Sequence, residues 1–174
     1  YCPYSAHDIA ERIHWRKDMI RSFDTGEIGP ADFFRAVSHI LEAKIEQDTF
    51  FRFYNDVFSV NPTVLDFLKR LKAHNKMILL SNTDVERFGF IKKKFPEIFL
   101  FDDYVLSFEV GYRKPQPEIY MEAIKKARVR AEECVLLDDL HENVEGAQKL
   151  GMNAILYELQ TDLETELKQL NVAI

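Results

Sequence analysis

Cysteine is scarce in this sequence, with Cys2 and Cys134 as the two representatives among 174 residues. Two cysteines without a Cys-x-x-Cys spacing support neither a disulfide framework nor a zinc site, which favours a reducing cytoplasm. No apolar run approaches the roughly 18 residues that a membrane span needs, and no signal peptide is visible. We therefore expect a cytoplasmic protein without a membrane partner.

Basic residues are also too few to dominate the surface, because Lys and Arg number 23 against 29 Asp and Glu. The net charge of -6 and the absence of a dense basic stripe argue against nucleic acid as the main partner. A local positive site for a small anionic substrate remains compatible with this balance. Hydrophobic residues make up 47%, enough for a core, and no feature here specifies an oligomeric state.

The first part of the chain, residues 1–60, is expected to be a helical domain. Apolar residues recur at helical spacing over 6–22, again from Pro30 onward, and in a third segment rich in Phe and Tyr. The aromatic stripe is more typical of a helix-bundle core than of a substrate surface. Periodicity leaves open whether Phe33, Phe34 and Trp15 face the core or a pocket.

Strands and helices alternate from residue 61 to the end. Short apolar strands are predicted at 76–80, 104–106, 135–137 and 154–157, with amphipathic helices between them. Alternation of this kind predicts an α/β domain over residues 61–174, with a doubly wound parallel sheet and helices on both faces.

Polar residues follow three of the predicted strands. Because binding sites in parallel sheets lie at the carboxyl ends of strands, these groups are expected to converge. A hydroxyl, an amide and helix-start N–H groups can hold a phosphate, and a fixed lysine can neutralise one. Two adjacent carboxylates repel unless a cation joins them, and their oxygens suit Mg²⁺. The candidates are Ser81, Asn82, Lys114, Asp138 and Asp139.

Each candidate also has a purely structural interpretation. Residues 81–84 are turn and cap types, with Thr83 and Glu86 at capping-box spacing. Lys114 is compatible with a solvated loop, and Asp139 with a helix cap. Spacing alone leaves these alternatives open.

Taken together and in order, the three segments resemble the haloacid dehalogenase superfamily, in the branch with a small helical cap inserted early. The matching motifs are Ile78-Leu79-Leu80-Ser81-Asn82-Thr83, Lys114-Pro115-Gln116-Pro117, and Val135-Leu136-Leu137-Asp138-Asp139 with Asn143-Val144-Glu145-Gly146-Ala147. The resemblance implies a Rossmann-like core and a cap that covers the site and selects the substrate.

The resemblance also implies a role for each residue. Ser81 would hydrogen-bond the phosphoryl group, with Asn82 helping through its backbone, and Lys114 would bridge that group and the nucleophile. Asp139 would ligate Mg²⁺ directly, and Asp138 would hold it directly or through water. The family's dehalogenases lack these metal acids, so the pair favours a Mg²⁺-dependent phosphatase of a small phosphorylated metabolite, acting through an aspartyl-phosphate. Alternatives are a non-catalytic regulatory or binding module and a haloacid dehalogenase.

The family's first motif, an Asp-x-Asp at the end of the central strand, does not occur in these 174 residues. Asp102-Asp103 has the wrong spacing. Without that strand, its two neighbours would lie roughly 10 Å apart, with unpaired inner edges. We therefore expect a preceding segment of about 15–20 residues in the parent protein. Without the nucleophile, the 174 residues alone are expected to be inactive.

Overall fold

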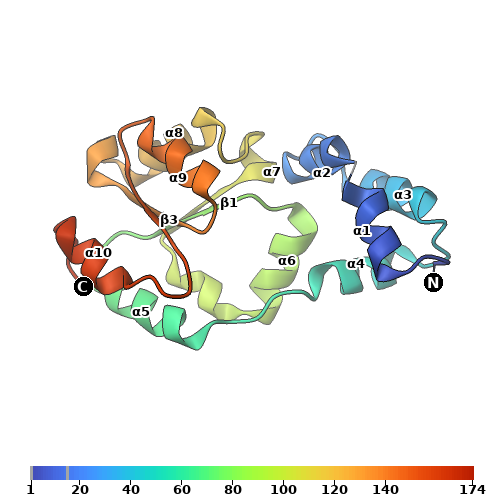
Figure 1. Ribbon diagram of the computed structural model, residues 1–174, viewed down its shortest axis with the longest axis horizontal. Helices are drawn as coiled ribbons and strands as arrows, with labels where there is room; N and C mark the ends of the chain where they lie inside the picture. The colour runs from blue at the N-terminus through green and yellow to red at the C-terminus, as the bar shows by residue number, and fades with distance from the viewer. Residues whose placement is uncertain (1, 15) are drawn as a thin grey trace.

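The computed structural model describes residues 2–14 and 16–174. Its first four helices are α1 (Ala6–His14), α2 (Lys17–Asp24), α3 (Pro30–Ile40) and α4 (Gln47–Asn55), and they form the helical lobe at one end of the molecule (Figure 1). The single helix predicted over 6–22 is wrong, because Arg16 has a non-helical backbone ahead of α2. Trp15 lies outside the described residues.

Aromatic side chains form the core of the helical lobe. Phe23 and Phe33 are almost fully buried, and their rings stack with centroids 4.2 Å apart. Phe33 therefore faces the core, and Phe34 packs against the same cluster from a partly buried position. The boundary at residue 60 stays a prediction, although among the described residues α1 to α4 precede it and the strands follow it.

The remaining elements make up the α/β lobe. It has four short strands, with helices α8 and α9 on one side and α5 and α10 on the other (Figure 1). The predicted α/β fold is confirmed. In order, the elements are α5 (Pro62–Lys72), β1 (Ile78–Ser81), α6 (Val85–Lys94), η1 (Pro96–Leu100), β2 (Asp103–Leu106), α7 (Ser107–Val110), α8 (Pro117–Ala127), η2 (Ala131–Glu133), β3 (Val135–Asp138), α9 (His141–Gln148), β4 (Asn153–Leu156) and α10 (Leu163–Gln169).

The strands pair in parallel, but as two separate ladders. β1 pairs with β2 from Ile78↔Asp103 to Ser81↔Leu106, and β3 pairs with β4 from Val135↔Asn153 to Asp138↔Leu156. Within the described part of the chain, β1 and β3 are not hydrogen-bonded to each other. The parallel sheet is thus divided into two ladders, as expected from the absence of an Asp-x-Asp strand in the sequence, and β1 and β3 each have one unpaired edge.

Side chains from both strand pairs share one apolar core beneath α8 and α9. Val105 of β2 and Leu136 of β3 belong to the same buried cluster as Ile119 and Tyr120 of α8 and Ala147 of α9. Alternate residues of β3 point the other way, toward α5 and α10, as the pleat of a strand requires. Packing therefore unites the two ladders, which backbone hydrogen bonds leave separate.

The close contact between α8 and α9 predicts that replacing Gly146 with alanine destabilises the fold. A Cβ at Gly146 would lie 2.9 Å from the Tyr120 hydroxyl and 3.1 Å from Cβ of Pro115. Alanine ordinarily stabilises a helix interior, but overpacking against the buried Tyr120 outweighs that gain. We expect Gly146→Ala to lower the free energy of unfolding by roughly 1–2 kcal/mol, measured by urea denaturation.

Gly89 of α6 provides the matched control, because a Cβ there meets no atom within 4 Å. Gly89→Ala should raise the free energy of unfolding by roughly 0.5–1 kcal/mol through helix propensity. Stabilisation of similar size by both substitutions would contradict the tight packing of α9 on α8.

Candidate active site

The carboxyl end of β1 is tied to the loop that carries Lys114. The side-chain amide of Asn82 donates from Nδ2 to the Lys114 carbonyl at 3.0 Å, and its Oδ1 accepts the Lys114 backbone N–H at 2.7 Å. This loop begins at Gly111, whose φ of +79° ends α7 in the left-handed conformation that glycine readily adopts. Asn82 thus holds the backbone of Lys114, while leaving its ammonium free to reach elsewhere.

The Lys114 ammonium reaches β3. Its Nζ lies 2.5 Å from Oδ2 of Asp138, and the two side chains are 11% and 3% exposed. Ser81, half-buried at the last position of β1, directly precedes Asn82. The structure therefore brings together the three segments that the sequence singled out, at the carboxyl ends of β1 and β3.

The second oxygen of Asp138 is held by α9. Its Oδ1 accepts the Leu140 backbone N–H at 2.9 Å and the Asn143 side-chain amide at 2.8 Å. Tyr120 then donates its hydroxyl to the Asn143 carbonyl at 2.8 Å. We did not predict this role for Asn143 from the sequence. The signal that could have indicated it is the position of Asn143, five residues after Asp138 and in the first turn of the following helix.

These contacts determine the ionisation of Asp138. Burial works to raise the pKa of this carboxyl, but donors from Lys114, Asn143 and the Leu140 N–H outweigh it, so the pKa lies below its ordinary value. A buried carboxylate is tolerated here because both of its oxygens accept hydrogen bonds.

Asp139 is placed differently from its neighbour. Its side chain is exposed, and α9 begins after Leu140 without a side-chain cap. The alternative that Asp139 caps this helix is therefore wrong. In the helix after β1 the N-cap is Asp84, whose carboxylate accepts the Arg87 N–H at 2.8 Å, one residue later than the capping box predicted at Thr83.

The donor set can be tested against Mg²⁺, which takes oxygen ligands and commonly uses one or two protein carboxylates, with water or phosphate completing the shell. Asp138 and Asp139 supply two adjacent carboxylates, one of them exposed, and this fits such a partial site. Across residues 2–14 and 16–174, no group of three His, Cys, Asp or Glu side chains is placed to hold a metal.

The family of the protein follows from this fold, this site and the sequence. Residues 4–151 match the family of haloacid dehalogenase-like hydrolases, and the chain belongs to it. The described residues include no helix long and apolar enough to cross a membrane.

Several named proteins resemble parts of the chain. An uncharacterized hydrolase of Schizosaccharomyces pombe is 35% identical over 114 residues, which cover 60% of this chain and 50% of the relative. A sesquiterpene phosphatase of Aspergillus oryzae is 30% identical over 75% of this chain and 67% of its own length. The chain thus spans only half of the S. pombe hydrolase that it matches.

Solved structures share the fold. A HAD family enzyme from Bacteroides thetaiotaomicron superimposes with a TM-score of 0.83 at 24% identity, covering 92% of this chain and 84% of that one. The same enzyme was solved in complex with magnesium and inorganic phosphate, with a TM-score of 0.78, 22% identity and coverage of 93% and 91%. A 2-haloacid dehalogenase from Pseudomonas syringae aligns with a TM-score of 0.62 at 23% identity, over 97% and 81% of the two chains.

The pKa of Asp138 generates a pH prediction. Lys114→Met removes one of the donors that lower the Asp138 pKa, while the burial that raises it remains. The pKa of Asp138 should therefore rise. Carboxyl NMR titration in metal-free buffer measures this change. In the unsubstituted chain the ionised carboxylate contributes stability above the unfolded pKa of about 3.9, and this is lost as pH falls through the lower folded pKa. The variant should lose less stability on acidification.

Lys126→Met is the matched control. Lys126 Nζ lies 2.9 Å from Oδ1 of Asp103, and the two side chains are 34% and 39% exposed. This ammonium lies away from the site and lowers the pKa of the Asp103 carboxyl. The substitution should raise the pKa of Asp103 and leave Asp138 unchanged. An unaltered Asp138 titration in Lys114→Met would show that the ammonium does not hold this carboxylate.

Proposed function

We propose that the chain is part of a Mg²⁺-dependent phosphatase acting on a small phosphorylated metabolite. The observation that carries the proposal is the contact of the Lys114 ammonium with Asp138, next to the exposed carboxylate of Asp139. Positive and negative groups together at the carboxyl ends of parallel strands are the combination that phosphoryl transfer needs, because its catalysis rests on positioning and charge. The phosphatase named among the relatives supports the same class.

In this proposal the side chains divide the work. The Ser81 hydroxyl donates to a phosphoryl oxygen, and the Lys114 ammonium, already fixed by its backbone bonds to Asn82, places positive charge beside it. Asp139 and Asp138 would hold Mg²⁺, which when bound offsets charge on the phosphoryl oxygens. The helical lobe covers the substrate and excludes water from the reacting group.

The nucleophile must be supplied by residues that this sequence does not contain. We propose that an extended segment ending in Asp-x-Asp pairs with the free edges of β1 and β3, between the two ladders. Its first carboxylate would form a bond to phosphorus as the ester oxygen leaves with a proton from the second aspartic acid. Water would then cleave the aspartyl-phosphate and release inorganic phosphate.

Complementation with a peptide tests this proposal. A synthetic peptide with an apolar strand ending in Asp-x-Asp is added to the chain, with p-nitrophenyl phosphate as a generic substrate. We expect phosphatase activity only when peptide and Mg²⁺ are both present. A peptide ending in Asn-x-Asp should bind equally well and give turnover lower by a factor on the order of 10³ or more.

The same assay separates the alternatives. Tight binding of the Asp-x-Asp peptide without turnover of any phosphomonoester would favour a regulatory or binding module. Halide release from a 2-haloacid without Mg²⁺ would identify a dehalogenase. Equal activity with the Asn and Asp peptides would contradict an aspartyl-phosphate route.

A further inference from the structure

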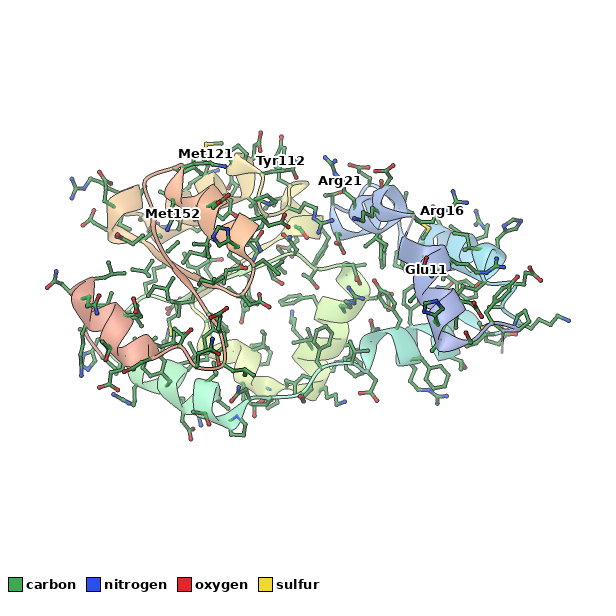
Figure 2. The ribbon with its side chains drawn as sticks, in the orientation of Figure 1. Glu11, Arg16, Arg21, Tyr112, Met121 and Met152 are labelled. Atoms are coloured by element: carbon green, nitrogen blue, oxygen red, sulfur yellow. The ribbon has the colours of Figure 1, made fainter. Side chains whose placement is uncertain are left out.

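A buried polar junction connects the helical lobe to the α/β lobe. It involves the two loops that carry the candidate site, which we name the first site loop (residues 81–84) and the second site loop (residues 111–116). Helix α4 packs against α6, which follows the first loop, and α2 packs against α7, which precedes the second. Figure 2 shows Tyr112 at the end of the α/β lobe that faces α2, where Arg21 is labelled.

The centre of the junction is Ser107, which is fully buried. Its hydroxyl accepts the Thr83 backbone N–H at 2.9 Å and lies 2.5 Å from the Asp24 carbonyl and 2.9 Å from that of Thr83. Close by, a Cβ at Gly26 would lie 2.5 Å from the Phe108 carbonyl, so the backbones of the two lobes touch. One hydroxyl thus joins the end of α2, the first site loop and α7.

The second site loop is held by a carboxyl group of the helical lobe. Oδ2 of Asp24 lies 3.6 Å from Nη1 of Arg113, whose neighbour in the chain is Lys114. Asp24 is 5% exposed, and its Oδ1 has no hydrogen-bond partner in the described part of the chain. Burial raises the pKa of Asp24, and the guanidinium of Arg113 offsets this only in part. Arg113 is therefore the principal charged partner of a buried carboxyl.

The first site loop is held in a comparable way. Tyr54 of α4 donates its hydroxyl to Oδ2 of Asp84 at 3.1 Å, and Asp84 is fully buried. The Arg87 guanidinium lies over the Tyr54 ring, 4.1 Å from its centroid, with its Nε 3.7 Å from the same carboxylate. Asp84 follows Asn82 by two residues, so a displacement of Tyr54 acts on the loop that binds Lys114.

We propose that Asp24 and Tyr54 position the second and the first site loop, respectively, and thereby fix the hydrogen-bonded pair of Asn82 and Lys114. In the second site loop the site residue Lys114 directly follows the junction residue Arg113, and in the first the site residue Asn82 lies two positions before the junction residue Asp84. The placement of the helical lobe therefore reaches Lys114 by two routes, directly through its neighbour Arg113 and through Asp84 and the hydrogen-bonded Asn82. The importance of this coupling for catalysis rests on the proposed function, but its existence is testable without activity.

Amide hydrogen exchange of the intact chain provides the test. The Lys114 N–H is bonded to Asn82 Oδ1, so its protection reports how firmly the two site loops are held together. We expect Tyr54→Phe and Asp24→Asn each to lower this protection roughly 2- to 30-fold, the range in which residues outside a site modulate coupling. The Asn153 N–H, bonded to the Cys134 carbonyl beside the β3–β4 ladder, serves as the reference and should keep its protection.

Two matched substitutions stay within the helical lobe. Tyr4→Phe removes an exposed hydroxyl that binds Glu42, and Asp32→Asn removes an exposed partner of Arg35. Both should leave the exchange of Lys114 unchanged. They separate the effect of the junction from that of losing any tyrosine hydroxyl or any carboxylate.

Two results would overturn the proposal. In one, the protection of Lys114 and Asn153 falls equally, which indicates general destabilisation rather than positioning. In the other, the protection of Lys114 is unchanged in both junction variants. Should either variant fail to fold, Arg113→Gln gives the same comparison from a side chain that is one-third exposed, and an unchanged Lys114 protection there also ends the proposal.

Discussion

The ion pair of Lys114 with Asp138 is the interaction on which the site depends, because it joins the β1–β2 and β3–β4 ladders, which are not hydrogen-bonded to each other in the part of the chain that the structure describes. Lys114 is bound to the end of β1 through Asn82, and Asp138 is the last residue of β3. Burying two charges is costly unless their remaining hydrogen-bonding capacity is used. Asn143 and the Leu140 N–H provide this for the carboxylate, and Tyr120 in turn holds Asn143.

The two site loops give this arrangement a second function. Within the second loop, Arg113 is directed to the helical lobe and Lys114 to Asp138. Within the first, Asp84 contacts the helical lobe while Asn82 binds Lys114. The helical lobe is thereby connected to the groups proposed for chemistry. This connection requires the burial of the Asp24 and Asp84 carboxyls, which is energetically unfavourable for their ionised forms and raises both pKa values.

Much of this structure was predictable where one local signal dominates. The helix predicted from Pro30 onward begins at that residue, and Ser81 and Asp138 are the last residues of β1 and β3. Periodicity could not foresee the break between α1 and α2, since the apolar pattern continues across it. It also could not identify the partnership of Asp24 with Arg113 or of Tyr54 with Asp84, because these pairs depend on how the lobes pack. The division of the sheet into two ladders agrees with the gap expected from the absence of an Asp-x-Asp strand in the sequence, and no feature of the four strands themselves predicted it.

The most direct measurement is a crystal structure of the chain grown with Mg²⁺ and inorganic phosphate. The account predicts phosphate within hydrogen-bonding distance of the Ser81 hydroxyl and the Lys114 ammonium, and Mg²⁺ on a carboxylate oxygen of Asp139. Phosphate bound elsewhere, or a metal-free Asp139 beside an ordered phosphate at Lys114, would contradict it.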